Sequence, residues 1–173
     1  MAATCNSCEV VIDQDTNETS YRSIYPDDIA SVDTAKRLGV ELIESGSFFK
    51  RVNLFGKEAY FEVLKNIKFN SQRKRSTLIV RHNEVIKLYC KGYTEVIYEI
   101  LGYHENKDNV ELNASLLRSA GSKGLRVTCM AMRIVSESEF AEFDKRIERA
   151  MKIFNEEQRE QEISKLVVIK MMR

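Results

Sequence analysis

The sequence predicts one mainly α-helical domain, a compact multi-helix fold with at most a small β hairpin. Three observations support this prediction. The chain has 173 residues, which is the usual size of a single domain. Its 43% hydrophobic and 31% charged residues provide enough apolar side chains for one core. Apolar residues also recur every three or four positions in several segments, which is the period of a helix with one buried face.

The first part of the chain is predicted to contain an irregular N-terminal arm and then a long helix. The arm covers residues 1–24, because Asp, Thr, Asn and Ser surround an apolar run at 10–12 that fits either a strand or a tail. The helix is expected over 25–45. Pro26 and the two acids after it suit a helix start, and Gly46 suits the position just past a helix end. The residues expected on its buried face are Ile29, Val32, Ala35, Leu38, Leu42 and Ile43.

The middle of the chain is predicted to alternate helices with exposed connections. Residues 48–55 are densely apolar, but their period does not decide between strand and helix. A helix is expected over 57–67, and 71–76 is expected to be an exposed connection because it holds no apolar residue. A short helix is expected over 83–88, capped by Asn83, and a better one over 94–101.

Towards the C-terminus, a polar loop at 103–109 and an ambiguous segment at 125–135 precede the clearest helix. Strand and buried helix both fit 125–135, and its flanks favour a helix. The last helix is expected to begin near Ser136 or Ser138 and to continue past Phe154. It is the last element of the predicted helical domain, which covers residues 25–155. A polar helix extension and tail are expected over 156–173. The last helix carries an apolar seam made of Phe140, Phe143, Ile147, Ala150 and Phe154.

This seam repeats in steps of three and four, like a coiled-coil heptad, but it is shorter than the three or four heptads that a free coiled coil needs. We therefore expect it to pack on its own domain. Self-association is the alternative, through Phe140, Phe143, Ile147 and Phe154.

Charge and composition limit the classes of function. The 27 Lys and Arg residues nearly balance the 26 Asp and Glu residues, so no overall field attracts nucleic acid or an anionic membrane. Residues 1–8 lack the basic start and apolar run of a secretory signal, and no stretch approaches the ~20 apolar residues of a membrane span. We therefore expect a cytoplasmic or nuclear protein whose four cysteines are reduced thiols.

Three short motifs begin like known sites, but none is complete. Cys5 and Cys8 have the two-residue gap of a zinc or redox pair, and no second pair follows. Residues 13–17 begin like a calcium loop, which then lacks its Gly and its final acid. Residues 119–124 hold the Gly and Lys of a phosphate loop at the wrong spacing. The two histidines lie in polar stretches and do not suggest a nucleophile and base. We therefore expect no cofactor, no metal and no enzymatic activity.

The one local concentration of positive charge is the run Arg73, Lys74 and Arg75, with Arg81, Lys87 and Lys91 nearby. Such a stretch can hold phosphates or an acidic peptide. Because the run 73–75 holds no aromatic residue for base stacking, nucleic acid is an alternative rather than the first interpretation.

Five short features follow one another between residues 63 and 103. They are Val63-Leu64-Lys65-Asn66, Arg75-Ser76, Asn83-Glu84-Val85-Ile86, Lys91-Gly92 and Ile97-Tyr98-Glu99-Ile100-Leu101-Gly102-Tyr103. Their order resembles that of the PUB domain, with the core at about 57–135. That family is a small helical module that grips tyrosine-bearing tails such as that of valosin-containing protein, a segregase ATPase. The chain departs from the family pattern where Ile67 and Ile86 replace the usual Pro and aromatic residue.

The resemblance implies a non-catalytic protein–protein interaction domain, an adaptor of ubiquitin and segregase pathways that binds a short acidic, tyrosine-containing peptide. It implies that Asn83 hydrogen-bonds the captured tail, that Arg81 and Lys91 meet its acidic residues, and that Val85 and Ile86 line the tyrosine slot. Two alternatives stay open. One is a helical regulatory or self-associating protein of another family, and the other is a nucleic-acid-binding protein that uses the basic stretch 73–91.

Overall fold

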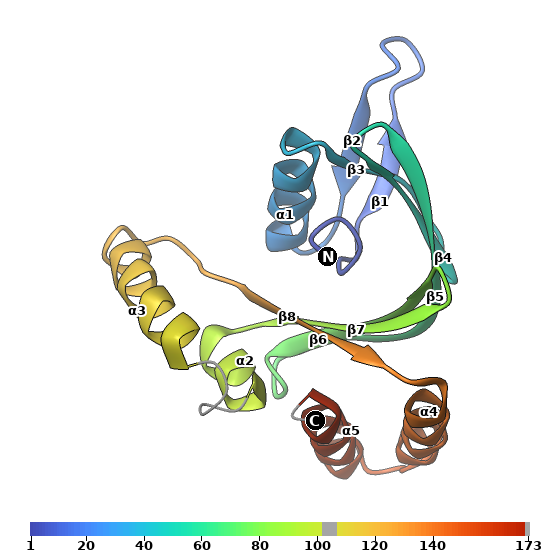
Figure 1. The fold of residues 1–173 in the computed structure, drawn as a ribbon, viewed down its shortest axis with the longest axis vertical. Coiled ribbons are helices and arrows are strands. Elements are labelled where there is room, and N and C mark those ends of the chain that lie inside the picture. Colours follow the sequence, from blue (N-terminus) through green and yellow to red (C-terminus); the bar gives the residue numbers. More distant parts are fainter. Residues whose placement is uncertain (102–106, 172–173) are drawn as a thin grey trace. The chain divides into compact units, whose positions relative to one another are not determined.

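The computed structural model describes residues 1–101 and 107–171. Within these residues it contains eight strands and five helices, and the strands form a two-stranded and a six-stranded sheet (Figure 1). The predicted mainly α-helical fold with at most a small hairpin is therefore wrong. The chain divides into two compact units. We call Met1–Asn66 with Leu78–Lys87 the N-terminal unit, and Ile67–Thr77 with Leu88–Arg173 the C-terminal unit.

The N-terminal unit begins with a hairpin and a helix. Strands β1 (Glu9–Ile12) and β2 (Thr19–Arg22) pair antiparallel within the segment expected to be irregular. Helix α1 (Pro26–Arg37) follows and contacts β2 and the next strand, β3 (Val40–Ser45) (Figure 1).

The start of α1 is confirmed, but its predicted extension to residue 45 is wrong. Gly39 has φ of 86°, a left-handed conformation that ends a helix at low cost, and β3 begins one residue later. Leu38, expected on the buried face of the helix, is 69% exposed as a result. Leu42, placed on the same helical face, is instead buried in β3.

The larger sheet has the strand order β3-β4-β5-β6-β7-β8. The strands after β3 are β4 (Phe49–Leu54), β5 (Lys57–Asn70), β6 (Arg75–His82), β7 (Val85–Gly92) and β8 (Cys129–Val135). Strands β3, β4 and β5 pair antiparallel, and Val52 of β4 faces Leu42 on one side and Ala59 on the other. Each of β5, β6 and β7 contributes residues to both units.

Strand β5 shows why a helical period was misleading for 57–67. The residues that fit the period of a helix are Tyr60, Val63, Leu64 and Ile67. Ala59, Phe61 and Val63 fit a period of two, and these three are the buried ones. The turn before β5 is a two-residue hairpin in which Phe55 and Gly56 have φ of 51° and 89°. A Phe-Gly pair is an unusual sequence for such a turn, so the hairpin gave a weak signal.

Two further helix predictions are wrong for a related reason. Residues 83–88 form a turn and the start of β7, and most of 125–135 is β8. Strand β7 is buried at almost every position from Ile86 onwards. A strand buried on both faces gives a continuous apolar run, which carries no period to separate it from a buried helix.

The C-terminal unit contains the other four helices. Helix α2 (Thr94–Leu101) confirms the helix predicted from the sequence and has the same bounds. Helix α3 (Lys107–Ser122) begins inside the segment expected to be a loop, while Gly102, Tyr103 and His104 lie outside the described residues. Helices α4 (Glu137–Met151) and α5 (Glu156–Met171) contact each other, and α5 also contacts α2.

The start of α4 is confirmed in detail, although the helix ends before Phe154. The Ser136 hydroxyl accepts from the Glu139 N–H at 3.2 Å, and the Glu139 carboxylate accepts from the Ser136 N–H at 3.1 Å. The pKa of Glu139 is lowered to about 2. The hydrogen bond from the Ser136 backbone N–H is the largest cause, and a hydrogen bond from the Arg133 side chain is the next.

Among the described residues, none of the helices combines the length and the apolar character that crossing a membrane requires. The domain boundaries expected after residues 24 and 155 stay predictions.

Candidate functional site

The turn chosen from the sequence as a peptide site joins β6 to β7. Asn83 and Glu84 are exposed and have φ of 49° and 60°, so they form a tight hairpin of two left-handed residues. Arg81 donates to a carboxylate on β5 at 2.8 Å. Val85 is half-buried, whereas Ile86 is 1% exposed. These predicted residues do share one hairpin, but Ile86 belongs to the core and has no surface with which to line a slot.

The remaining predicted residues lie elsewhere. Lys91 is at the other end of β7, in the C-terminal unit, and is 5% exposed. In the α4 seam, Phe143 and Ile147 are each 2% exposed and Phe140 is half-buried, whereas Phe154 follows the helix and is fully exposed. Most of the seam therefore packs within the chain, and its role in self-association stays a prediction.

The turn between β5 and β6 separates its three basic side chains. Arg73 and Arg75 are 7% and 5% exposed, whereas Lys74 between them is exposed. The Asn70 side-chain oxygen accepts from the N–H groups of Gln72 and Arg73, and the Asn70 carbonyl accepts from the Lys74 N–H at 2.7 Å. Lys74 has φ of 52°, which is costly for a residue with a Cβ. The turn thus holds a strained Lys74 at the surface.

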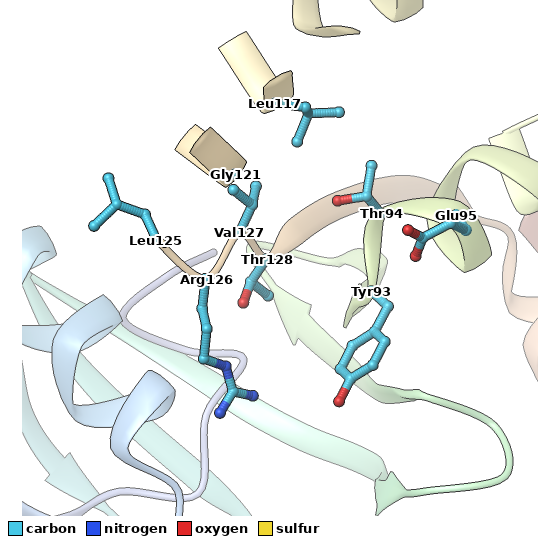
Figure 2. A pocket seen from close by; sticks show the side chains of 9 residues that line it. All are labelled: Tyr93, Thr94, Glu95, Leu117, Gly121, Leu125, Arg126, Val127 and Thr128. Carbon is cyan, nitrogen blue, oxygen red and sulfur yellow. The ribbon is translucent and has the colours of Figure 1, made fainter. Parts of the chain in front are cut away.

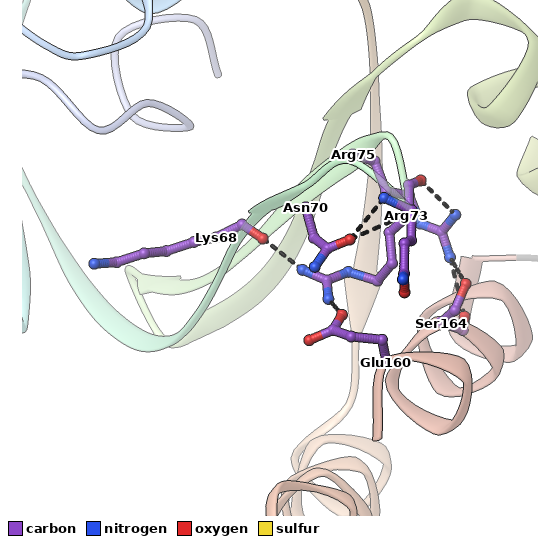
Figure 3. Close-up of polar contacts among 7 residues, drawn as sticks. Lys68, Asn70, Arg73, Arg75, Glu160 and Ser164 are labelled. Atoms are coloured by element: carbon purple, nitrogen blue, oxygen red, sulfur yellow. Dashed lines mark hydrogen bonds and ion pairs between the residues drawn. The ribbon is translucent and has the colours of Figure 1, made fainter. Parts of the chain in front are cut away.

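The two buried arginines contact α5 (Figure 3). The Arg73 guanidinium pairs with the Glu160 carboxylate and donates to the carbonyl of Lys68 at 2.5 Å. Arg75 Nη2 donates to the hydroxyl and the carbonyl of Ser164, at 2.9 and 3.0 Å. Burial lowers the pKa of both guanidinium groups, and their mutual repulsion lowers that of Arg73 further. Both stay charged at neutral pH, because the ordinary pKa of Arg lies far above 7.

The end of β7 lies against this turn. A Cβ on Gly92 would be 2.6 Å from both the Lys74 carbonyl oxygen and the Arg75 Cβ, so a side chain does not fit there. The Tyr93 N–H donates to the Lys74 carbonyl at 3.0 Å. The Lys91-Gly92 step of the sequence therefore has a packing role, because it brings Tyr93 beside the strained turn.

A pocket of about 500 Å³ opens at Tyr93, between the start of α2, the end of α3 and the segment that leads into β8. Figure 2 shows the Tyr93 hydroxyl and the Arg126 guanidinium pointing to the same side, away from the α3 residues. The Tyr93 ring is 43% exposed and lies 6.2 Å from the Phe69 ring, centroid to centroid. The pocket is lined by Tyr93, Thr94, Glu95, Leu117, Gly121, Leu125, Arg126, Val127 and Thr128.

These groups suit a ligand that has both an aromatic ring and phosphates. Phe69 and Tyr93 offer ring faces for stacking. Arg126 offers a guanidinium, whose forked donors match phosphate oxygens. Thr94 and Thr128 add hydroxyl groups that can donate or accept. We use the name Tyr93 pocket for the pocket with the groups named above, which are Phe69, Tyr93, Thr94, Arg126 and Thr128, together with Lys74.

The sequence prediction missed Phe69, Tyr93 and Arg126. A signal for the first two was present, because Phe69 stands four residues before Arg73 and Tyr93 stands two residues after Lys91. Both aromatic residues stand outside the basic run 73–75 on which the sequence prediction relied. The close approach at Gly92 brings the end of β7 beside the β5–β6 turn, and that approach is a property of the fold.

The Cys5 and Cys8 thiols are buried in the N-terminal unit. Near them, Lys50 is 4% exposed and donates from Nζ to Asn6 Oδ1 at 3.3 Å and to Ser45 Oγ at 3.0 Å. Burial lowers the pKa of this lysine. Across residues 1–101 and 107–171, no three His, Cys, Asp or Glu side chains are grouped so that they could hold a metal ion.

Nearly the whole chain, residues 1–172, matches the family model described as P-type ATPase, cytoplasmic domain N. This chain belongs to that family. Over 71% of its length the N domain is 38% identical to the phospholipid-transporting ATPase DNF1 of Chaetomium thermophilum, of which it covers 8%. It is 32% identical over 84% of its length to the human phospholipid-transporting ATPase IC, covering 11% of that protein. It is 30% identical over 95% of its length to the Schizosaccharomyces pombe phospholipid-transporting ATPase dnf2, covering 12% of that protein.

The family overturns several predictions at once. The resemblance to the PUB domain is wrong, and with it the adaptor function in ubiquitin and segregase pathways, because the chain is a P-type ATPase N domain. The expectation of a non-enzymatic protein is wrong for the family, whose members are ATPases. The expected localisation, cytoplasmic or nuclear, is also wrong, because the family model describes a cytoplasmic domain of P-type ATPases and the relatives are phospholipid-transporting ATPases. The chain spans 8–12% of the length of these relatives. The expected partner, an acidic tyrosine-bearing peptide, is untested.

Proposed function

We propose that this N domain binds ATP in the Tyr93 pocket and that it serves an ATPase that transports phospholipid. The names of the relatives support the nucleotide and the transported lipid. The chemistry of the pocket supports its location. Because the chain spans 8–12% of these relatives, ATP hydrolysis and phospholipid transport are proposed for the whole protein and not for the domain alone.

The observation that carries the proposal is the pairing of Phe69 with Tyr93 beside a pocket that holds Arg126. An adenine ring is flat, and stacking of a base on an aromatic side chain is worth ~1–3 kcal/mol. Glu95 is the one acid among the nine lining residues in the described part of the chain. A carboxylate repels phosphates but accepts from an amino group, so we place the adenine near Glu95 and the two rings.

The phosphates then extend towards the cations. Arg126 can donate from the two arms of its fork to two phosphate oxygens, and the exposed Lys74 supplies a second positive charge. Thr94 begins α2, where backbone N–H groups without helical partners favour an anion. A pocket of about 500 Å³ lies within the range of small-molecule sites, ~300–1,000 Å³.

Calorimetric titration of the domain with ATP tests the proposal. We expect binding, and we expect Tyr93→Ala to raise Kd about tenfold, the loss of one stacking face. Tyr60→Ala is the matched control, because Tyr60 is an exposed tyrosine of the N-terminal unit that stacks on another aromatic ring. Its Kd should stay within about twofold of wild type. A folded domain that takes up no ATP at ~5 mM, or a Tyr93→Ala variant with unchanged Kd, would disprove the proposal.

A second experiment addresses the whole protein. In the purified full-length ATPase, ATP hydrolysis should depend on added phospholipid. Tyr93→Ala should raise KM for ATP about tenfold and leave kcat nearly unchanged, because the ring binds the base away from the reacting phosphate. Hydrolysis that ignores phospholipid would remove the transport part of the proposal. A fall in kcat at constant KM would place Tyr93 in a different role.

A further inference from the structure

Helix α5 holds the β5–β6 turn at two points that are one helical turn apart. Glu160 and Ser164 are four residues apart and therefore lie on one face of the helix. Glu160 pairs with Arg73, and the side chains of this ion pair are 13% and 6% exposed. Ser164 accepts from Arg75 through both its hydroxyl and its carbonyl oxygen (Figure 3). The two contacts belong to one compact unit, the C-terminal unit.

These contacts compensate two charges that burial disfavours. Burial is the main cause of the lowered pKa of both Arg73 and Arg75. Removal of a buried partner leaves an uncompensated charge, which the chain can relieve by moving the guanidinium towards water. Movement of Arg73 would carry the neighbouring backbone with it.

That backbone is the strained part of the turn. Lys74 keeps φ of 52° while its N–H donates to Asn70 and its carbonyl accepts from Tyr93. A non-glycine residue persists in this conformation when its surroundings fix it from several sides. Here the two arginines on either side of Lys74 provide that constraint, because both are tied to α5.

We propose that Glu160 and Ser164 are positioning residues of the ATP site. They keep Arg73 and Arg75 turned towards α5, and they thereby hold Lys74 at the surface beside Tyr93, where it meets the phosphates. The two arginines contribute little to phosphate binding themselves. This inference rests on the proposed function, and it assigns α5 control over the phosphate-dependent part of the affinity.

The test compares ATP with AMP, because the two ligands share the base and differ in the phosphates that Lys74 reaches. We expect Glu160→Gln to raise Kd for ATP about fivefold and to leave Kd for AMP within about twofold of wild type. Glu162→Gln is the matched control on the same helix, since its carboxylate pairs with the exposed Lys165 at 2.7 Å. Both of its Kd values should match wild type. Equal weakening of ATP and AMP by Glu160→Gln, or no weakening of either, would overturn the inference.

A double variant separates positioning from a direct contact. Lys74→Gln should lower the preference for ATP over AMP to the same extent as Glu160→Gln, and adding it to Glu160→Gln should cause little further loss. Fully additive losses would show that Glu160 does not act through Lys74.

A second single variant covers the case in which Glu160→Gln does not fold. Arg73→Lys keeps the charge pair and hence the charge balance, but lacks the fork that contacts both Glu160 and the Lys68 carbonyl. It should also lower the preference for ATP over AMP, and an unchanged preference would contradict the inference. Wild type is the reference: if it binds neither nucleotide, the proposed function fails. If wild type binds ATP but Lys74→Gln leaves the ATP preference intact, only the positioning role fails.

Discussion

The β5–β6 turn and the β6–β7 turn both carry exposed polar side chains, and both contain residues with positive φ. Lys74 of the first has φ of 52°, and Asn83 and Glu84 of the second have φ of 49° and 60°. The first turn is flanked by buried arginines that contact α5, and the end of β7 packs against it. The second turn is a short hairpin whose two central residues are exposed. The sequence prediction chose the second as the binding site.

The difference teaches that charge and exposure alone do not identify a site. At the β5–β6 turn, neighbouring elements fix the strained residue and bring an aromatic ring and a pocket beside it. At the β6–β7 turn, the strain serves chain reversal, as in any tight hairpin. Three predictions break or sharpen this comparison.

The largest effect is expected from Gly92→Ala. The added Cβ would meet the Lys74 carbonyl and the Arg75 Cβ at 2.6 Å, and backbone atoms cannot move aside cheaply. We expect the free energy of unfolding in urea to fall by about 2–3 kcal/mol and ATP binding to weaken by more than about tenfold.

For stability, the control for Gly92→Ala is Gly121→Ala in α3, where a Cβ would meet nothing within 4 Å. ATP binding is not compared for this control, because Gly121 lines the pocket. In a helix this change should raise stability by about 0.5–1 kcal/mol. If Gly92→Ala unfolds at the same urea concentration as wild type, the β5–β6 turn is not packed as tightly as described.

The second prediction applies one change to both turns. Lys74→Gly and Glu84→Gly each remove the cost of a left-handed residue, so each should raise the free energy of unfolding by about 1 kcal/mol. Lys74→Gly should nevertheless weaken ATP binding about fivefold, because a cation is lost, whereas Glu84→Gly should leave it unchanged. Urea unfolding and calorimetry measure the two quantities. Equal effects on ATP binding would abolish the distinction between the turns.

The smallest effect is expected at the connection between β8 and α4, which is anchored but does not line the pocket. Glu139→Gln removes a carboxylate that accepts from Ser136 and Arg133, and should lower the free energy of unfolding by about 0.5 kcal/mol at pH 7. The folded pKa of about 2 lies below the ordinary 4.5, so this stabilisation is complete above pH 4.5 and is lost as the pH falls towards 2.

Thermal unfolding of wild type and Glu139→Gln across that pH range checks this prediction, and the two should converge at the acidic end. ATP binding should be the same in both proteins. A weaker affinity in the variant would mean that anchoring a connection is enough to influence the site.

The helices with marked ends were the predictable part of the fold. Pro26 with its acids and Ser136 with Glu139 mark where α1 and α4 begin, because helix starts depend on neighbours in the sequence. Proline and acids suit the first turn of α1, and a capping box closes the start of α4. The bounds of α2 were equally readable. Strands β5, β6, β7 and β8 were not, since their side chains are buried by partners from distant parts of the chain and their apolar runs fit two periods.

The candidate site was less predictable than the fold. Lys91 was chosen for a different function, and Lys74 was noted as part of a basic run. Nothing in the sequence near Arg126 indicates that it lines the same pocket as Tyr93, which precedes it by more than thirty residues. That arrangement depends on how β8 and α3 return to α2, a non-local property of the fold.

The central claim is that ATP binds at the Tyr93 pocket and not at the β6–β7 turn. Titration of the isotopically labelled domain with ATP, followed by backbone amide resonances, tests this most directly. The account predicts that the amides of Lys74, Tyr93 and Arg126 shift with saturation, while those of Asn83 and Glu84 stay in place. Shifts centred on Asn83 and Glu84, with Tyr93 unaffected, would contradict it.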